Sequence, residues 1–381
     1  VRVCPWLGQS GNTFTTSLSR TLLRACCGTV GIASVSMSSM AGAPLAGTCV
    51  PPFDSSRITF LASHGVELEE ISPIGANVRG LDLRKTPPAP VLEALEAEMA
   101  NRGFLVFKEQ GQLSGDEQVR ASELWGAQEM HSTHGVHPKA PNRHIFRLSN
   151  DRSVGINGVG PQWHNDGSFE RAVFGHVGYH IIRVPENGGA TSFAHQGAAF
   201  DALSPADQQR WERLVSVNSN SGVLHPMVHS HPISGRKSVY LHLGMTGAVI
   251  ELDEAGKPSR LLEEEEMQDL FHQYNDLLNG GFSSSEPYSV AYEYTEGDMV
   301  VIDNLAVAHK AMPEAHADAK KQGLRILHRT TIKARQNFDP PAPLPPALNV
   351  YGPNPFGPKA SGVWIGGGIG FRWDENIRMQ N

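Results

Sequence analysis

Residues 162–169 of the chain read Gln-Trp-His-Asn-Asp-Gly-Ser-Phe, and the rest of the sequence is interpreted around them. The stretch places the imidazole of His164 and the carboxylate of Asp166 two positions apart. Side chains of an extended segment alternate between its two faces, so this pair points to one side. Gly167 then frees the backbone to turn. The stretch is therefore a candidate for two ligands of a metal site.

The third ligand would come from far along the chain. Two histidines and one carboxylate on one face of a metal form the 2-His-1-carboxylate triad of non-haem Fe(II) oxygenases. An apolar strand at 299–302 runs into a turn that delivers His309, our candidate. Residue counting alone does not select it, because other histidines compete: His176, His180, His195, His225, His229, His231 and His328. A histidine on a strand is also more often structural than a ligand.

Residues 324–332 alternate as a strand that carries Arg325 and Arg329. Four positions apart, the two arginines share a face, with Cα atoms about 13 Å apart. A guanidinium that points inward needs an anion, and its planar fork grips a carboxylate or sulfonate at two points. The pair predicts two anionic ligands in sequence along a pocket. The alternative is that one or both arginines make surface ion pairs.

The composition is that of an ordinary globular protein, with 40% hydrophobic and 19% charged residues among 381. The net charge of -7 means that the chain has no excess of basic residues to bind phosphate groups. This argues against nucleic acid or an anionic membrane as partner. No apolar run approaches the roughly 20 residues that span a bilayer. The acidic run at 263–266 could be a metal cage, but the solvated face of a helix is the simpler interpretation.

Residues 1–53 differ in kind from the rest. They contain no Asp or Glu, many Ser and Thr, and arginine as their only charge. This composition is typical of an organellar transit peptide for a mitochondrion or plastid. The alternative is a cytoplasmic protein that starts at Met37 or Met40. All four cysteines lie before residue 50, so the remaining chain has no disulfide framework or thiolate metal site.

From residue 66 the pattern is that of a folded domain. We expect helices at 91–101, at 114–126 after a capping box, from Ser204-Pro205, and at 261–278. We expect strands at 66–78, 103–107, 144–148, 173–184, 239–243, 289–294, 299–302 and 324–332. Many short strands with a few helices in their connections predict a mainly β fold, either a sandwich or a jelly roll with helical additions. The tail at 335–381 is a Pro- and Gly-rich extension.

Taken together, these segments resemble the taurine dioxygenase (TauD/TfdA-like) family of Fe(II)- and 2-oxoglutarate-dependent dioxygenases. Residues 163–169 resemble its Trp-His-x-Asp-x-Thr-Phe motif, and Pro-Glu-Asn-Gly-Gly-Ala-Thr at 185–191 resembles its Pro-x-x-Gly-Gly-Asp-Thr motif. Further matches lie at 224–237, at 297–309 with the distal histidine, and on the arginine strand at 325–332. The resemblance implies a double-stranded β-helix core. It divides the chain into 1–53, a dioxygenase domain at 66–334, and the tail.

The resemblance implies that His164, Asp166 and His309 bind iron. It also implies that Thr191 and Arg325 hold the distal carboxylate of the co-substrate 2-oxoglutarate. With O2, such an oxidoreductase oxidises 2-oxoglutarate to succinate and CO2 and hydroxylates a primary substrate.

On the substrate side, the resemblance implies that Arg329 faces an anionic group and that His131 contacts the substrate, with His134 as the alternative. The predicted substrate is a small sulfonate, sulfate ester or carboxylate, and the predicted protein partner is a further copy of this chain in a homo-oligomer. Asn165, Gly167 and the extra residues between the distal histidine and the arginine strand depart from the family pattern. Asn165 and Gly167 are therefore expected to alter the substrate side of the pocket, which puts taurine itself in doubt.

Two other functions remain open from the residues alone. A zinc hydrolase can use the same His, Asp and His ligands and keep one position for water. A catalytically silent jelly-roll binding protein is the other alternative.

Overall fold

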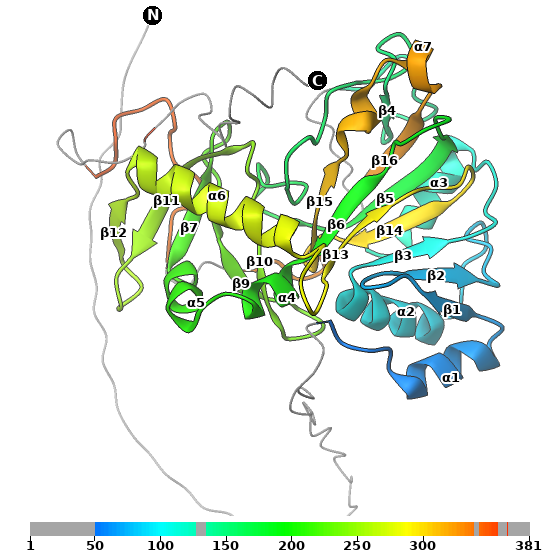
Figure 1. Cartoon of the computed structure of the whole chain (residues 1–381), viewed down its shortest axis with the longest axis horizontal. Coiled ribbons are helices and arrows are strands. Elements are labelled where there is room, and N and C mark those ends of the chain that lie inside the picture. Colours follow the sequence, from blue (N-terminus) through cyan, green and yellow to red (C-terminus); the bar gives the residue numbers. More distant parts are fainter. Residues whose placement is uncertain (1–49, 127–134, 339–342, 357–363, 365–381) are drawn as a thin grey trace, which may run out of the picture. The chain divides into compact units, whose positions relative to one another are not determined.

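The largest sheet has seven strands in the order β1-β2-β3-β14-β5-β16-β4 (Figure 1). The computed structural model describes residues 50–126, 135–338, 343–356 and 364. The strands of this sheet are Glu67–Glu70 (β1), Ala76–Arg79 (β2), Phe104–Phe107 (β3), Phe146–Ser149 (β4), Phe174–Arg183 (β5), Met299–Asp303 (β14) and Ile326–Lys333 (β16). Only β2 and β3 pair in parallel; the other neighbours are antiparallel.

A second, three-stranded sheet completes the core. Its order is β13-β6-β15, with strands Ser289–Tyr292 (β13), Thr191–His195 (β6) and Val307–Ala311 (β15). Residues of both sheets meet in one buried apolar cluster, which includes Val177, Val300, Phe193 and Val307. This cluster is called the inner core below. Two mainly antiparallel sheets that share an apolar core form the predicted jelly roll.

The central strands β3 and β14 are buried on both faces. Phe104 and Val106 of β3 lie in the inner core, while Leu105 and Phe107 lie in a second, outer cluster. Helices cover this outer face: Ser55–Ser63 (α1), Ala89–Arg102 (α2) and Gly115–Glu123 (α3). Because alternate side chains enter two different apolar layers, these strands read as continuous hydrophobic runs in the sequence.

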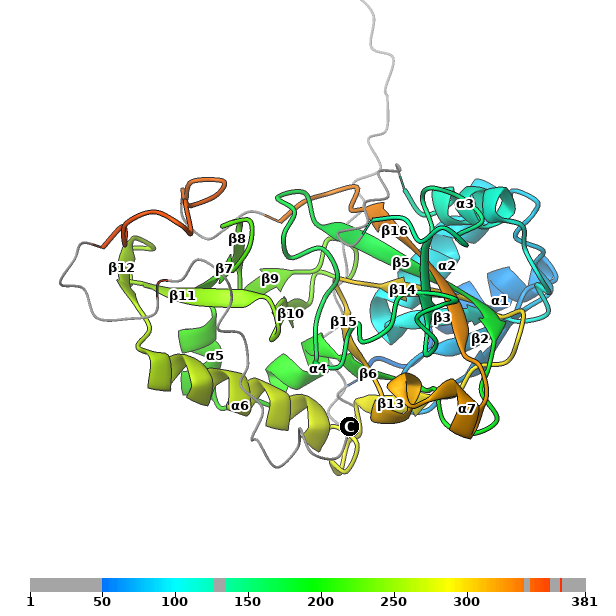
Figure 2. The same cartoon turned by 90° about the horizontal axis from the view of Figure 1, so that it is seen from above.

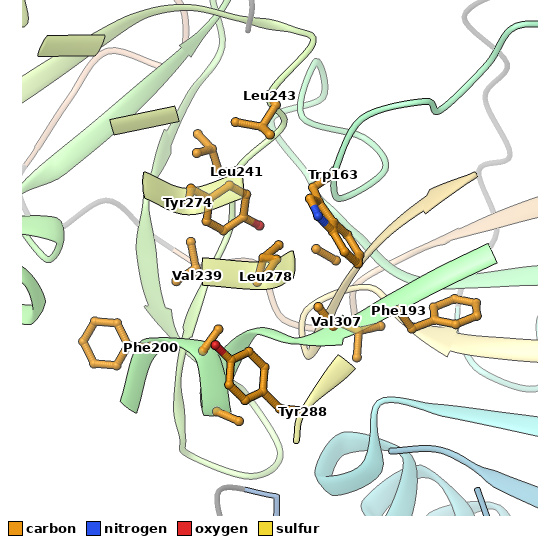
Figure 3. Packing of buried hydrophobic residues seen from close by; sticks show 14 of the residues in the cluster. Trp163, Phe193, Phe200, Val239, Leu241, Leu243, Tyr274, Leu278, Tyr288 and Val307 are labelled. Atoms are coloured by element: carbon orange, nitrogen blue, oxygen red, sulfur yellow. The ribbon is translucent and has the colours of Figure 1, made fainter. Parts of the chain in front are cut away.

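The segment between β6 and β13 builds a side layer. It contains a four-stranded sheet, with strands Leu214–Asn218 (β7), Leu224–Pro226 (β8), Thr246–Leu252 (β11) and Pro258–Leu261 (β12). It also contains the pair Val228–Ser230 (β9) and Lys237–Val239 (β10), and the helices Gln196–Asp201 (α4), Pro205–Trp211 (α5) and Glu264–Gly280 (α6). Figures 1 and 2 show α6 running along β11 and β7. Tyr274 and Leu278 of α6 reach the inner core near Trp163 (Figure 3).

The expected helices are confirmed, including two of their caps. The side chains of Ser114 and Glu117 form the predicted capping box of α3, and Ser204 caps α5 through the N–H of Asp207. The acidic run at 263–266 is the first turn of α6, as expected for a solvated helix face. The strand expected at 239–243 is largely wrong, because β10 ends at Val239. Its continuation packs as loop, with Leu241 and Leu243 in the inner core.

The described part of the tail packs on the side layer, where Leu348 and Val350 join the cluster of β7 and β11. Among the described residues, no helix combines the length and the apolar character needed to cross a membrane. Residues 1–49 lie outside the described residues, so the transit segment stays a prediction.

Candidate functional site

Two short backbone segments hold His164 beside His309. After β14 the chain turns at 304–306 and returns as β15, so His309 stands on a strand rather than in the turn. The backbone N–H of each histidine donates to the carbonyl of the other, at 3.1 and 3.0 Å. The ring centroids are 4.2 Å apart. The neighbouring Trp163 and Val307 anchor both segments in the inner core (Figure 3).

Asp166 is fixed by the side chain of Asn304 in that turn. The N–H of Asp166 donates to Asn304 Oδ1 at 2.9 Å, and Asn304 Nδ2 donates to the carbonyl of Asp166 at 2.9 Å. Asp166 Oδ1 lies 3.8 Å from His164 Nε2, and Oδ2 lies 3.8 Å from His309 Nε2. One ligand atom from each of the three residues lies within 4.8 Å of the others. The two histidines and the carboxylate thus converge on one point.

Burial and neighbouring charges set the protonation of the three groups. Burial lowers the pKa of His309 to about 3 and also lowers the pKa of His164. Burial alone would raise the pKa of Asp166, but the positive charge of Arg329 and the two histidines outweigh it and lower that pKa. At neutral pH the cluster therefore offers two neutral imidazoles and one carboxylate, the forms that bind a metal.

The donor atoms of this cluster fit a divalent cation. His164 Nδ1 donates to the carbonyl of Gln162 at 2.7 Å, which leaves the lone pair on Nε2. Both ring nitrogens of His309 and Oδ2 of Asp166 are buried without a hydrogen-bond partner among the described residues. Buried polar atoms are normally paired, so a group of orphaned nitrogen and oxygen donors suits a metal with these ligands.

A cavity with about 470 Å³ of space, its open mouth included, borders the cluster. Its wall includes both histidines together with Thr191, Tyr179, Arg325 and Arg329. Arg325 is only 8% exposed, and its Nε donates to the carbonyl of Gly189 at 3.1 Å. Burial lowers the pKa of Arg325, because a charged guanidinium is less stable away from water. A bound anion would offset this unfavourable free energy of burial.

Arg329 lies on the same wall as Arg325, as their spacing predicts, but it has a partner that the sequence did not indicate. Its Nη1 donates to Asp166 Oδ1 at 2.8 Å. Its guanidinium also lies over the ring of Phe146, with 4.6 Å to the centroid. A substrate anion at Arg329 therefore has to share this arginine with Asp166.

Asn165 and Gly167 are absent from the described wall of the cavity, and their expected effect on its substrate side stays a prediction. Asn165 is fully buried, and its Nδ2 donates to Gln196 Oε1 at 2.8 Å while its Oδ1 accepts from the N–H of Leu241 at 3.2 Å. Gly167 has a φ of +86°, and a Cβ there would lie 2.5 Å from the ring of Phe174. Asn165 and Gly167 therefore stabilise the conformation of the backbone that carries the ligands His164 and Asp166.

Replacing Asn165 by Ala is expected to lower the free energy of unfolding by about 3 kcal/mol, because several buried polar groups lose their partners at about 1–3 kcal/mol each. Thermal unfolding followed by circular dichroism should show a fall in Tm of roughly 4–5 °C, as expected for a fold of this size. The exposed Asn220→Ala is the control and should change stability by less than about 0.5 kcal/mol. An unchanged Tm for Asn165→Ala would show that this network does not support the site.

The remaining predicted residues have different outcomes. His131 and His134 lie outside the described residues. The competing histidines stay out of the ligand cluster. His231, for example, pairs with Asp303 at 3.0 Å.

Sequence reasoning missed Tyr179 and His316, which both line the cavity. The alternation of β5 could have shown Tyr179, because it places that residue on the inner face with Val177 and Ile181. No sequence signal marks His316.

A jelly roll that holds two imidazoles and a carboxylate beside a cavity with buried arginines has the ligand set of the non-haem Fe(II) oxygenases. Residues 67–331 match the Taurine catabolism dioxygenase TauD, TfdA family, and the chain belongs to this family. It is an Fe(II)- and 2-oxoglutarate-dependent dioxygenase, as predicted. Neither the zinc hydrolase nor the silent binding protein receives support.

Individual relatives and one solved structure are similar to most of this chain. The chain is 27% identical over 283 residues to an alkylsulfatase of Acinetobacter baylyi, covering 68% of this chain and 82% of the relative. It is 24% identical over 302 residues to an alpha-ketoglutarate-dependent sulfate ester dioxygenase of Pseudomonas putida, covering 71% and 91%. The crystal structure of a taurine dioxygenase from Burkholderia xenovorans matches with a TM-score of 0.56 at 20% identity, covering 72% and 93%. This last likeness confirms the jelly-roll fold.

Proposed function

We propose that His164, Asp166 and His309 bind the Fe(II), and that Thr191 and Arg325 hold the distal carboxylate of 2-oxoglutarate. The observation that carries the proposal is the set of buried ligand atoms within 4.8 Å of one another. Thr191 and Arg325 support it because they line the same cavity. Arg325 also has no ion-pair partner among the described residues, so its charge is available to an acid.

When bound, Fe(II) and 2-oxoglutarate would supply, with O2 as the oxidant, the oxidative decarboxylation that yields succinate and CO2 and drives hydroxylation of the substrate. The residues of the chain position the metal ligands and the co-substrate. The bond from His164 Nδ1 to Gln162 fixes one imidazole, and the two bonds of Asn304 fix the backbone of Asp166. The buried setting of Arg325 strengthens its attraction to a carboxylate, because little water screens the pair.

The proposed substrate is a small sulfonate, sulfate ester or carboxylate. Arg329 supports this class because its guanidinium lines the cavity close to Asp166, where an anionic group could be held next to the reacting carbon. The activities for which the two relatives are named, an alkylsulfatase and a sulfate ester dioxygenase, support the same class. Hydroxylation beside a sulfonate or an ester oxygen gives an unstable adduct that fragments.

The experiment is a panel of sulfonates, sulfate esters and carboxylates, with neutral and cationic compounds of similar size as controls, tested with Fe(II), 2-oxoglutarate and O2 for stimulated succinate release. At least one anionic compound should raise succinate formation above the rate without substrate. Stimulation only by neutral or cationic compounds would overturn the substrate class. Product formation that persists without 2-oxoglutarate would instead indicate a hydrolase.

Arg329→Gln is expected to raise the KM of the best compound in that panel about 30-fold, because a charge-assisted contact of about 2 kcal/mol is lost. Arg329→Lys keeps the charge but lacks the planar guanidinium, so its substrate KM should lie between those of the wild type and Arg329→Gln. The KM for 2-oxoglutarate should change much less than the substrate KM. If Arg329→Gln left the substrate KM unchanged, the proposed role of this arginine would be wrong.

A further inference from the structure

The segment between His309 and Arg325 brings one more side chain to the cavity. It contains the 3-10 helix Pro313–His316 (η1) and the short helix Ala319–Gln322 (α7). The last residue of η1, His316, lines the cavity together with Thr191 and Arg325. It has no role in the site as proposed above.

One asparagine ties this segment to the strand that follows it. Asn150 Nδ2 donates to the carbonyls of Ala317 and Gly323, at 3.1 and 3.0 Å. Asn150 Oδ1 accepts from the N–H of Arg325 at 2.8 Å. Because the same amide holds the residue after His316 and the backbone of Arg325, the two side chains keep a fixed relation to each other.

The ring of His316 has one nitrogen engaged and one without a partner. Nδ1 lies 3.3 Å from Asn157 Oδ1, while the amide nitrogen of Asn157 donates to the carbonyl of Asn150 at 3.5 Å. With the amide oxygen facing the ring, Nδ1 is the protonated nitrogen. Nε2 is buried and has no hydrogen-bond partner among the described residues. Such an atom on a cavity wall indicates a ligand that supplies the missing partner.

We propose that His316 is a third contact to the distal carboxylate of 2-oxoglutarate, beside Thr191 and Arg325. The inference rests on the proposed function. Asn150 holds the segment of His316 beside the backbone of Arg325, and both side chains line the cavity. The ring is therefore assigned to the co-substrate end of the cavity. The two oxygens of a carboxylate have enough lone pairs for all three side chains.

The tautomer makes this contact depend on pH. Since Nδ1 donates to Asn157, Nε2 can donate only when the ring is protonated. A bound carboxylate raises the pKa of that imidazolium, so binding is accompanied by uptake of a proton. The affinity therefore increases as the pH falls through the pKa of the ring in the complex. Glu314 on η1 is exposed, and Asn157 carries no charge. The other titratable groups on the cavity wall are His164, His309, Tyr179, Arg325 and Arg329.

The test is calorimetric titration of the full chain, loaded with Mn(II), with 2-oxoglutarate and with its unreactive analogue N-oxalylglycine. His316→Leu is expected to raise the Kd of both acids about tenfold at low pH, as for a lost hydrogen bond to a charged group. The wild type should bind more tightly at pH 6 than at pH 8, and His316→Leu should lose this dependence. His316→Gln should recover affinity without the pH dependence, because its amide donates at any pH.

Lys320→Gln, an exposed change on α7, is the matched control and should bind like the wild type. If His316→Leu fails to fold, the pH profile of His316→Gln alone carries the test. Variants that keep the wild-type Kd and the wild-type pH dependence would overturn the inference. A wild type that binds neither acid would instead overturn the proposed function, so the two failures are distinguishable.

Discussion

Asp166→Ala is expected to abolish substrate-dependent succinate release, with a loss of at least about 1000-fold, equivalent to about 4 kcal/mol. The change removes the one anionic ligand of the proposed Fe(II) site. It also leaves the buried Arg329 without its carboxylate, and this uncompensated positive charge then opposes a bound cation. Succinate formation and calorimetric Mn(II) affinity are the two measurements, and both should fall together.

Asp166→Asn separates charge from shape, because the amide keeps the volume of the side chain while losing its negative charge. It should lose cation affinity and, because the buried Arg329 loses its counter-charge, unfold at a lower temperature than the metal-free wild type. Asp269→Ala, exposed on α6, is the control and should retain full activity. Activity of Asp166→Ala within about tenfold of the wild type would exclude this carboxylate as a ligand.

Arg325→Leu is expected to raise the KM for 2-oxoglutarate at least about 100-fold, because two charge-assisted hydrogen bonds of about 1.5 kcal/mol each are lost. Since Arg325 lies at the opposite end of the co-substrate from the reacting carbon in this assignment, kcat at saturating 2-oxoglutarate should fall far less than kcat/KM. Succinate release measured against 2-oxoglutarate concentration checks the result.

Arg325→Lys should restore part of the affinity, because it keeps a charge but not the two-point geometry. Arg183→Leu at the end of β5 is the matched control, since that side chain is 63% exposed and should leave the KM for 2-oxoglutarate unchanged. An Arg325→Leu enzyme with a wild-type KM would place the distal carboxylate elsewhere in the cavity.

Local patterns in the sequence predicted the elements that obey a simple period or cap. Residues 299–302 and 324–332 became β14 and β16, and Ser114 and Glu117 cap α3, because these signals depend only on neighbouring residues. The His164 and Asp166 spacing was also informative, although only His164 is extended and bridges the returning strand β15, while Asp166 lies in the turn that follows.

Features that depend on distant partners could not be predicted in this way. The strands β6, β7, β11 and β15 were not expected as separate elements, because their pairing is decided by other strands far along the chain. The bond between Arg329 and Asp166 joins residues 163 positions apart. His316 reaches the cavity only because Asn150 anchors the extra segment, and no local pattern encodes that anchor.

The burial of β3 and β14 on both faces has a consequence for how such an enzyme acquires new substrates. A substitution on either strand disturbs one of two apolar layers, so few changes there preserve the fold. The loop at 150–160 and the segment at 312–324 also border the cavity, but they are held mainly by backbone and asparagine bonds. Mutational libraries in these two segments that leave Asn150 and His316 unchanged should therefore yield altered selectivity with the smallest loss of folded protein, whereas libraries on the central strands should yield mostly insoluble variants.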